Sequence, residues 1–397
     1  MKPVRELAIF GGSPAFGAPV HVAQLNLPDW AKVERIFREI FRRRYYANNG
    51  PLVRALDDTF AEHLGVNHAV CVTNGTIGLA MLARALELSG EVVVPAFTFP
   101  ATVQALSWAG LTPVLCDVSV ETHMMTPETV ATSVSSDTTG ILGVHLWGRA
   151  CDPDGLQDFS AKRGLTLLFD ACHAIGCTYR GQAIGGLGAG EVFSFHATKV
   201  LNGAEGGCIT TNDAQLADRL RTMRNFHATE TFAMVESRLN GKMSEAQAAM
   251  ALLSLADLPR NIAANMERHQ KYSELLRDVP GLSLMQYPGE ANNFQYVVVE
   301  VEAAACSLHR DVLLRLLTAE NVLCRRHFYP GIHRMAPYRD SISARTGTFP
   351  GTDRLCGSLL QLPTGQTVAA ADIEQICDLL HGIVDHAEEI TARLDAQ

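Results

Sequence analysis

The sequence lacks the features of a membrane-spanning, disulfide-bonded or nucleic-acid-binding protein. No apolar run reaches the roughly 18–20 residues that a bilayer-spanning helix needs, and the N-terminus has no long apolar segment typical of a secretory signal. The ten cysteines form no Cys-x-x-Cys pair, and the spacing of Cys172 and Cys177 fits no zinc site. The net charge is −9 and the basic residues are scattered. We therefore expect reduced thiols, no metal, a cytoplasmic location, and no nucleic-acid or membrane partner.

Signature motifs of four common enzyme classes are also missing. The chain has no Gly-x-Gly-x-x-Gly, no Gly-x-x-x-x-Gly-Lys-Ser/Thr, no His-Glu-x-x-His and no Gly-x-Ser-x-Gly. A nicotinamide enzyme, a P-loop ATPase, a zinc protease and an α/β-hydrolase therefore lose support. A small anionic substrate is still compatible with the negative net charge, because a pocket can be locally positive.

A regular alternation of strand and helix signals occupies the first two thirds of the chain. With 397 residues, of which 47% are apolar, the chain is long enough for two domains and a large core. Helices are expected between most of the strands, which we predict at residues 68–73, 91–94, 112–117, 140–145, 166–170, 191–195 and 207–211. Strands that alternate with helices of this length predict an α/β domain with a largely parallel, covered sheet.

The flanking segments read differently. Residues 29–44 show helical spacing of apolar residues, and a second amphipathic helix ends at Gly65. After the helices expected at 244–258 and 260–277, the pattern becomes strand 294–301, helix 308–320, strand 322–325 and mostly helix over 369–394. We predict a large domain over residues 1–259 and a smaller α+β domain over residues 260–397.

Lys199 follows a short apolar run and lies in a glycine-rich turn. Residues 192–195 read as the end of a buried strand, and glycines follow at 203, 206 and 207. A lysine amine with small residues around it can form a Schiff base with a carbonyl cofactor, because the cofactor must approach closely. The alternative is an exposed lysine that happens to follow a strand.

Two further segments could hold such a cofactor. Residues 73–78 join a strand to a helix, whose first N–H groups bind anions. The helix dipole supplies only ~0.3–2 kcal/mol, so the hydroxyls of Thr76 and Ser194 would have to help. Asp170 ends an apolar strand, where ligands of open sheets gather. It could hold a protonated ring nitrogen, or cap the next helix. His173 could stack on a ring or fill the core, and Phe99 has the same two interpretations.

In this order the segments closely resemble the sugar aminotransferases of the DegT–DnrJ–StrS family. Members are pyridoxal-phosphate enzymes of the aspartate-aminotransferase fold (fold type I). The resemblance implies a three-layer α/β/α large domain with a mainly parallel sheet and a smaller α+β C-terminal domain. It spans nearly the whole chain and is carried by the segments at residues 49–51, 74–76, 95–99, 144–148, 170–174, 194–199 and 205–207.

The resemblance implies a role for each candidate residue. Lys199 would be the catalytic lysine that binds pyridoxal 5′-phosphate, and Asp170 would pair with the pyridine nitrogen. Phe99 and His173 would lie against the two faces of the cofactor ring. The phosphate would be bound by Gly75, Thr76, Ile77 and Ser194 of the same chain, and by Asn240 and Lys242 of a neighbouring subunit. His327 would line the sugar site. The family's aromatic residue between Asn240 and Lys242 is Gly241 here. Shared sites imply a homodimer.

The activity implied by the resemblance is transfer of an amino group from L-glutamate to a nucleotide-linked keto-6-deoxysugar. We expect dTDP-4-keto-6-deoxy-D-glucose to be aminated at C4, in deoxyaminosugar and natural product biosynthesis. Amination at C3 of the sugar is one alternative. Amination of a keto-inositol (scyllo-inosose) is another, because residues 7–14 resemble the corresponding segment of the enzymes that aminate keto-inositols. A non-catalytic pyridoxal-phosphate-binding regulator is a third. The expectation of C4 comes from general similarity, and the regiochemistry and stereochemistry of the product are assigned to no particular residue.

Overall fold

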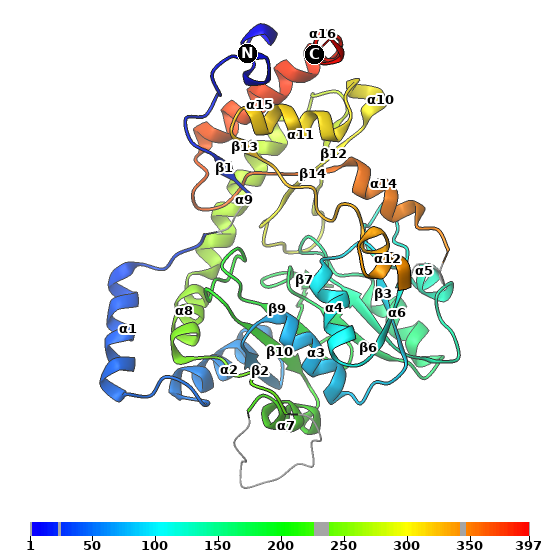
Figure 1. The fold of residues 1–397 in the computed structure, drawn as a ribbon. Helices are drawn as coiled ribbons and strands as arrows, with labels where there is room; N and C mark the ends of the chain where they lie inside the picture. The colour runs from blue at the N-terminus through cyan, green and yellow to red at the C-terminus, as the bar shows by residue number, and fades with distance from the viewer. Residues whose placement is uncertain (1, 23–24, 226–237, 342–346, 397) are drawn as a thin grey trace.

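A seven-stranded sheet forms the centre of the computed structural model, which describes residues 2–22, 25–225, 238–341 and 347–396 (Figure 1). The strand order is β2-β10-β9-β6-β5-β3-β4, and β10 is antiparallel to both of its neighbours while the other pairs are parallel. This confirms the predicted α/β class with a mainly parallel sheet. The strands are β2 (His68–Val72), β3 (Glu91–Pro95), β4 (Thr112–Cys116), β5 (Thr138–Val144), β6 (Thr166–Asp170), β9 (Glu191–Ser194) and β10 (Gly207–Thr211).

Helices cover both faces of this sheet. Alternate residues of one strand join different apolar clusters, as Val70 and Cys71 of β2 do, because successive side chains point to opposite faces. One face is covered by α3 (Gly75–Ala85), α4 (Pro100–Trp108) and α7 (Ala214–Met223). The other is covered by α2 (Pro51–Leu64), α5 (Pro127–Ala131), α6 (Pro153–Ala161) and α8 (Glu245–Ala256). These are the three layers that the sequence predicts.

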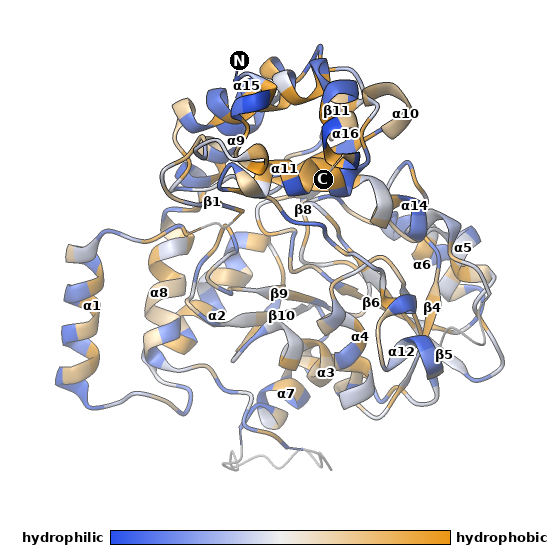
Figure 2. Cartoon of the chain, turned by 45° about the horizontal axis from the view of Figure 1, so that its top comes forward, coloured by the Kyte–Doolittle hydropathy of each residue, from blue (hydrophilic) through white to orange (hydrophobic). Residues whose placement is uncertain are grey.

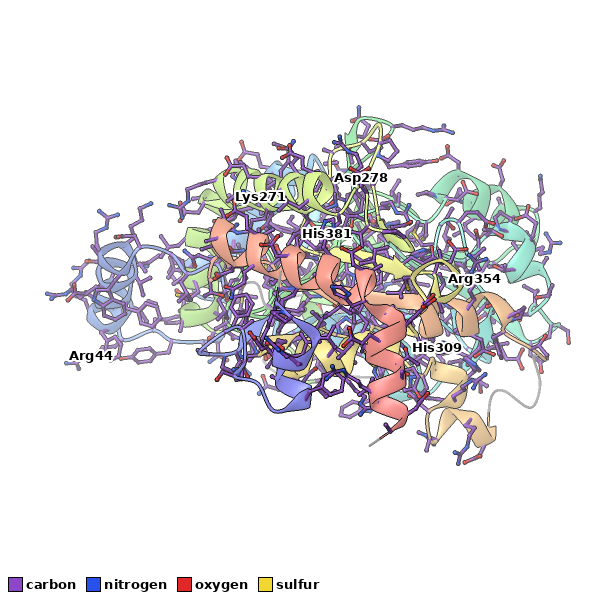
Figure 3. All side chains as sticks on the ribbon, turned by 90° about the horizontal axis from the view of Figure 1, so that it is seen from above. Arg44, Lys271, Asp278, His309, Arg354 and His381 are labelled. Carbon is purple, nitrogen blue, oxygen red and sulfur yellow. The ribbon has the colours of Figure 1, made fainter. Side chains whose placement is uncertain are left out.

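A smaller unit lies against the edge where the parallel strands end. Its antiparallel sheet has the order β11-β12-β14. Figure 3 looks down on this unit and shows Lys271 of α9 near His381 of α15. The Nε2 atom of His381 forms a hydrogen bond with the backbone carbonyl of Leu275 at 2.9 Å, and this bond links the two helices. Its elements are α9 (Leu258–Leu275), β11 (Leu282–Leu284), β12 (Val297–Val301), α10 (Ala303–Cys306), α11 (Arg310–Ala319), β13 (Val322–Leu323), β14 (Leu359–Leu362), α15 (Ala370–Asp385) and α16 (Ala387–Asp395).

The N-terminal segment packs on this smaller unit. The one-turn helices η1 (Val4–Glu6) and η2 (Ala8–Phe10) contribute to its apolar core, and β1 (Val20–His21) pairs with β13. The buried carboxylate of Glu320 accepts hydrogen bonds from Lys2 and from the backbone of Ala8 and Ala15. The predicted boundary between the two domains at residue 259 therefore stays a prediction. Residues 4–16, which we assigned to the large domain, pack against the C-terminal unit.

Short elements complete the chain. They are β7 (Thr178–Tyr179), β8 (Gln182–Ala183), η3 (Ile332–Arg334), α12 (Tyr338–Ser341) and α14 (Pro350–Ser358). Asp117, just after β4, accepts hydrogen bonds from the backbone of Gly351 and Thr352 and from the Thr352 hydroxyl, so α14 is tied to the large sheet.

Helix α1 (Trp30–Arg43) stands away from the body and contacts α8 (Figures 1 and 2). Asp29 caps it by accepting a hydrogen bond from the Lys32 N–H. Of its apolar residues only Ile40 is buried, whereas Trp30 is 72% and Phe41 64% exposed. The sequence pattern predicts the helix correctly, but α8 covers its apolar face only in part, since Val33, Ile36 and Phe37 are half-buried.

Candidate active site

A cavity of about 560 Å³ lies where the two units meet, beside the ends of β6 and β9. The large sheet and its loops supply most of the wall, and the rest comes from Val22 and from Gln295, Tyr296, Arg325, His327 and Phe328 of the smaller unit. The predicted site residues that line it are Gly75, Thr76, Phe99, Asp170, His173, Ser194, Lys199 and His327. The structure therefore brings together eight of the eleven residues named from sequence.

Lys199 extends into the cavity from the loop after β9. Backbone hydrogen bonds close the loop, from Phe195 N–H to the Gly206 carbonyl and from Gly203 N–H to the Phe195 carbonyl. Lys199 Nζ donates to the hydroxyl of Tyr296 at 3.3 Å. Burial works against the charged amine, but Tyr296, Cys172 and Asp170 outweigh it, so the pKa of Lys199 is raised. Lys199 is thus a partly buried cavity residue and not an exposed lysine.

Asp170 is held from two directions at the end of β6. Its Oδ2 accepts a hydrogen bond from Thr102 Oγ1 at 2.8 Å, and its Oδ1 accepts from the Cys172 N–H at 3.0 Å. The alternative role as a helix cap is wrong, because residues 171–176 form turns and no helix follows. A fixed, 6% exposed carboxylate at a cavity wall is suited to holding a cationic ring nitrogen.

The start of α3 provides free backbone donors. Asn74 caps the helix by accepting from the Ile77 N–H at 2.9 Å, which leaves the N–H groups of Gly75 and Thr76 without intrahelical acceptors. Ser194, at the end of β9, adds a hydroxyl. This donor set fits a phosphate. Ile77 does not line the cavity and its N–H is already engaged, so a role for Ile77 stays a prediction.

Two glycines keep this cradle close to the sheet. A Cβ at Gly207 would lie 2.8 Å from the backbone nitrogen of Gly75, and a Cβ at Gly75 would lie 3.0 Å from Cys172 Sγ. Any side chain at Gly207 would therefore push the first turn of α3 away from β10. The crowding explains why a glycine-rich turn surrounds the phosphate cradle.

His173 packs among aromatic side chains at the cavity wall, and its stacking on a cofactor ring stays a prediction. Its ring lines the cavity, lies 4.6 Å from the Tyr296 ring and stacks on Trp147 at 5.9 Å. Burial, with the charges of Lys199 and His327, lowers the pKa of His173 well below its ordinary value. A neutral imidazole with an unpartnered, buried Nδ1 forms this wall in the described structure. Phe99 lines the same cavity and is 54% exposed.

The remaining predicted residues divide between the cavity and the outer surface. His327 lines the cavity, and burial beside Arg325 and Lys199 lowers its pKa to about 4. Asn240 and Lys242 do not line this chain's cavity, and Lys242 Nζ donates to Asn240 Oδ1 at 2.8 Å. Their predicted role in a neighbouring subunit stays a prediction.

Sequence reasoning missed the cavity contacts of Thr102 and Tyr296. Thr102 lies within the predicted helix after residue 99, and Tyr296 lies 97 positions from the lysine it contacts. Only the position of Thr102 in the first turn of the helix that follows the strand at 91–95 could have signalled its contact. Within the described residues, no group of three His, Cys, Asp or Glu side chains is placed to hold a metal ion. None of the described helices is long and apolar enough to cross a membrane.

The cavity offers an amine, a carboxylate, the N-terminus of a helix and a flat neutral ring, and this combination fits pyridoxal phosphate. Lys199 matches its aldehyde, Asp170 its pyridine nitrogen, and Gly75, Thr76 and Ser194 its phosphate. The fold and the site therefore define a pyridoxal-phosphate-dependent enzyme of fold type I.

The family model of the DegT/DnrJ/EryC1/StrS aminotransferases matches residues 31–381, and the chain belongs to this family. It is an aminotransferase whose cofactor is pyridoxal phosphate.

Two curated relatives share the printed name dTDP-4-amino-4,6-dideoxy-D-glucose transaminase. The protein from Escherichia coli is 29% identical over 376 residues, which cover 91% of this chain and 98% of the relative. The protein from Shigella dysenteriae is 32% identical over 321 residues, which cover 81% and 87%.

Two solved structures extend the similarity to the whole fold. DesI, crystallised in the presence of its TDP-sugar product, is 41% identical with a TM-score of 0.93, and the match covers 99% of this chain and 100% of DesI. DesV of S. venezuelae is 26% identical with a TM-score of 0.82, and the match covers 90% and 95%.

Proposed function

We propose that this aminotransferase transfers an amino group from L-glutamate to C4 of dTDP-4-keto-6-deoxy-D-glucose. The observation that carries the sugar assignment is the 41% identity, over 99% of the chain, to a protein whose structure was solved with its TDP-sugar product. The printed names of the two curated relatives support the same class of substrate. The cavity, with Lys199 and Asp170 on its wall, supplies the chemistry that such a transfer needs.

Both proposed substrates are anions, and the cavity carries positive charge to receive them. Arg325 lines it and forms no ion pair with a carboxylate among the described side chains. Lys199 adds a second cation, while Asp170 and Glu205 are the acidic residues of the wall. A guanidinium pairs well with the carboxylate of glutamate or with a diphosphate. Arg325 therefore supports acidic substrates in a protein of negative net charge.

The residues have separate tasks in this reaction. When bound, pyridoxal phosphate supplies an electron sink for the carbanion formed at the substrate carbon. Lys199 Nζ accepts the proton from the α-carbon of the donor and later returns a proton to the product. Asp170 keeps the ring nitrogen protonated, with a gross attraction of roughly 5 kcal/mol at ~3 Å and an effective dielectric of ~20. Thr102 fixes the Asp170 carboxylate in the orientation that this requires.

A homodimer with shared sites is part of the proposal. The exposed apolar residues of α1 and of the segments beside it support it, since contiguous exposed apolar surface marks interaction sites. They include Leu25, Leu27, Trp30, Phe41, Tyr45 and Tyr46. The position of Lys242 outside its own chain's cavity is compatible with a site in the second subunit. A cytoplasmic location is also proposed, and the ten free cysteines agree with a reducing compartment.

Product analysis by NMR tests the substrate assignment. The protein is incubated with pyridoxal phosphate, L-glutamate and dTDP-4-keto-6-deoxy-D-glucose, and a parallel sample contains scyllo-inosose instead of the sugar. We expect a new 4-amino sugar, whose couplings give the configuration at C4. Turnover of the keto-inositol alone would overturn the sugar assignment and leave the roles of Lys199 and Asp170 standing.

A further inference from the structure

Tyr296 reaches the catalytic lysine from the other unit of the molecule. It lies one residue before β12, lines the cavity, and accepts a hydrogen bond from Lys199 Nζ at 3.3 Å. The lysine stands on the loop after β9, so this bond joins the small unit to the reacting nitrogen. The rest of the Tyr296 ring contacts the aromatic side chains of Trp147 and His173.

Packing fixes the position of the Tyr296 hydroxyl. The ring meets Trp147 edge to face at 5.3 Å and tilts against His173 at 4.6 Å. The hydroxyl of Tyr287 donates to the backbone carbonyl of Tyr296 at 3.4 Å, so it bonds the main chain and not the Tyr296 hydroxyl, and Tyr287 does not line the cavity. Burial is the largest influence on the Tyr296 phenol and raises its pKa, so the hydroxyl keeps its proton at neutral pH. A neutral oxygen is thus held in place, aimed at Lys199.

The other groups around Lys199 are less suited to hold its amine. Asp170 has both oxygens bonded to Thr102 and to the Cys172 N–H. His173 and His327 are neutral rings whose pKa values are lowered, and Cys172 Sγ contacts the Val192 carbonyl. Tyr296 is the side chain that holds Nζ in the described structure.

We propose that Tyr296 is a catalytic residue that holds and aims the Lys199 amine while this amine is free and carries the substrate's proton. The inference rests on the proposed function only in assigning the proton transfer to Lys199. The proton leaves the α-carbon of the amino donor, and its bonding electron pair passes to the electron sink that the cofactor supplies when bound. The amine becomes an ammonium that donates one N–H to Tyr296 Oη, and in the second half of the reaction the same amine gives a proton to the carbon of the product. The phenol keeps its own proton throughout, so the step balances without another reactant.

The test compares Tyr296→Phe with Tyr287→Phe. Both substitutions remove one buried hydroxyl and keep the ring, but only the first removes the partner of Lys199. The protein is loaded with pyridoxamine phosphate, which leaves the Lys199 amine unbonded. Trace acetylation by acetic anhydride is then measured across a pH series, and mass spectrometry of the Lys199 peptide gives the titration midpoint of the amine.

We expect the midpoint to move to lower pH by about one unit in Tyr296→Phe, because the ammonium loses a hydrogen bond that helps to offset burial, while Cys172 and Asp170 still favour the charged amine. In steady state, kcat should fall about 10- to 100-fold with KM values nearly unchanged. Tyr287→Phe should change neither quantity. Circular dichroism and bound pyridoxal phosphate per chain check that each variant is folded.

An unchanged midpoint and an unchanged kcat in Tyr296→Phe would overturn the proposal. So would an equal shift in Tyr287→Phe, because the effect would then come from packing. The labelling needs neither substrate. If the wild-type enzyme fails to aminate the sugar, the proposed function fails, while the midpoint still decides the role of Tyr296.

Discussion

Asp170 is fully arranged before any ligand is bound. Hydrogen bonds from Thr102 and from the Cys172 N–H hold its two oxygens, so the carboxylate loses no rotational freedom when a ring nitrogen arrives. Such preorganisation lets a single charge act at full strength in a cavity with little water. At the scale of one residue, the neighbours of the carboxylate therefore matter as much as the carboxylate itself.

Substitution of Asp170 and of its support should give graded losses. Asp170→Asn removes the charge, and we expect kcat/KM to fall at least about 100-fold, since a large part of roughly 5 kcal/mol of gross attraction is lost. Thr102→Val keeps the charge and removes one hydrogen bond, which is worth about 1 kcal/mol, so a loss of about 5-fold is expected. Steady-state kinetics with saturating pyridoxal phosphate measures both. Equal activity of Asp170→Asn and wild type would remove Asp170 from the mechanism.

His123 makes the folded chain sensitive to acid. Its buried Nδ1 accepts from Trp147 Nε1, and burial beside Arg149 lowers its pKa to about 4. Below the unfolded pKa of about 6.5, the unfolded chain binds a proton that the folded chain does not, so stability falls as the pH drops towards 4.

Denaturant unfolding at pH 7.5 and at pH 5 tests this contribution. Between these values the wild type should lose about 2 kcal/mol more stability than His123→Asn, which lacks the titrating ring. Asparagine suits the position because the backbone φ of residue 123 is 64°. If both proteins lose the same amount, His123 has an ordinary pKa in the folded state.

The first turn of α3 depends on a neighbouring strand. Gly207 of β10 lies against the peptide that joins Asn74 to Gly75, so this element can start only where the strand has no side chain. The backbone donors that we propose for the phosphate are therefore placed by sheet packing.

Gly207→Ala should weaken cofactor binding by disturbing this turn. We expect the Kd for pyridoxal phosphate to rise about 10-fold or more, because the new methyl group forces the helix start outward, with a cost of about 1–3 kcal/mol typical of overpacking. Gly357→Ala is the matched control, since its Cβ would meet nothing within 4 Å and it lies on the exposed side of α14. Titration followed by absorbance measures both. Wild-type affinity in Gly207→Ala would show that the turn tolerates the shift.

The strands of the central sheet and the long helices were predictable from sequence, while two strands of the smaller unit were not. The seven central strands follow from apolar runs bounded by turn residues, and the helix at 30–43 from its apolar spacing. Strands β11 and β14 have three and four residues and escaped notice, and the helix expected over 369–394 is broken at His386. The predicted strand at 294 begins at Val297, because Asn292 and Asn293 bond the backbone of residues 294 and 295. The Lys199–Tyr296 bond joins segments that no local pattern connects.

The whole molecule places its cavity between two units that each supply part of the wall. The large unit contributes Lys199, Asp170 and the proposed phosphate donors to the cavity wall, while the smaller unit contributes Tyr296, Arg325 and His327. Asp117 ties α14 to the large sheet, so the relative position of the units is maintained beside the cavity. Substrate contacts from both units follow from this arrangement.

Mixing two inactive variants tests whether sites are shared. Lys199→Ala should abolish turnover while pyridoxamine phosphate stays bound, and Lys242→Ala should weaken the phosphate site of the partner. A hybrid dimer of the two has one site with Lys199 from one subunit and Lys242 from the other, so refolding the variants together should restore part of the activity. Each variant refolded alone is the control. No recovery in a verified hybrid would place both lysines in one chain's site or exclude Lys242.

Helix α1 has a consequence for how easily the chain can be cut. It is joined to the body at its two ends, it carries exposed Arg38, Arg42 and Arg43, and Arg44 lies at its far end in Figure 3. Such a segment is open to trypsin in a lone chain and shielded once a second copy covers its apolar face. If the proposed homodimer covers this face, the rate of cleavage in α1 falls as protein concentration rises, and the concentration at half protection reports the dissociation constant of the proposed dimer.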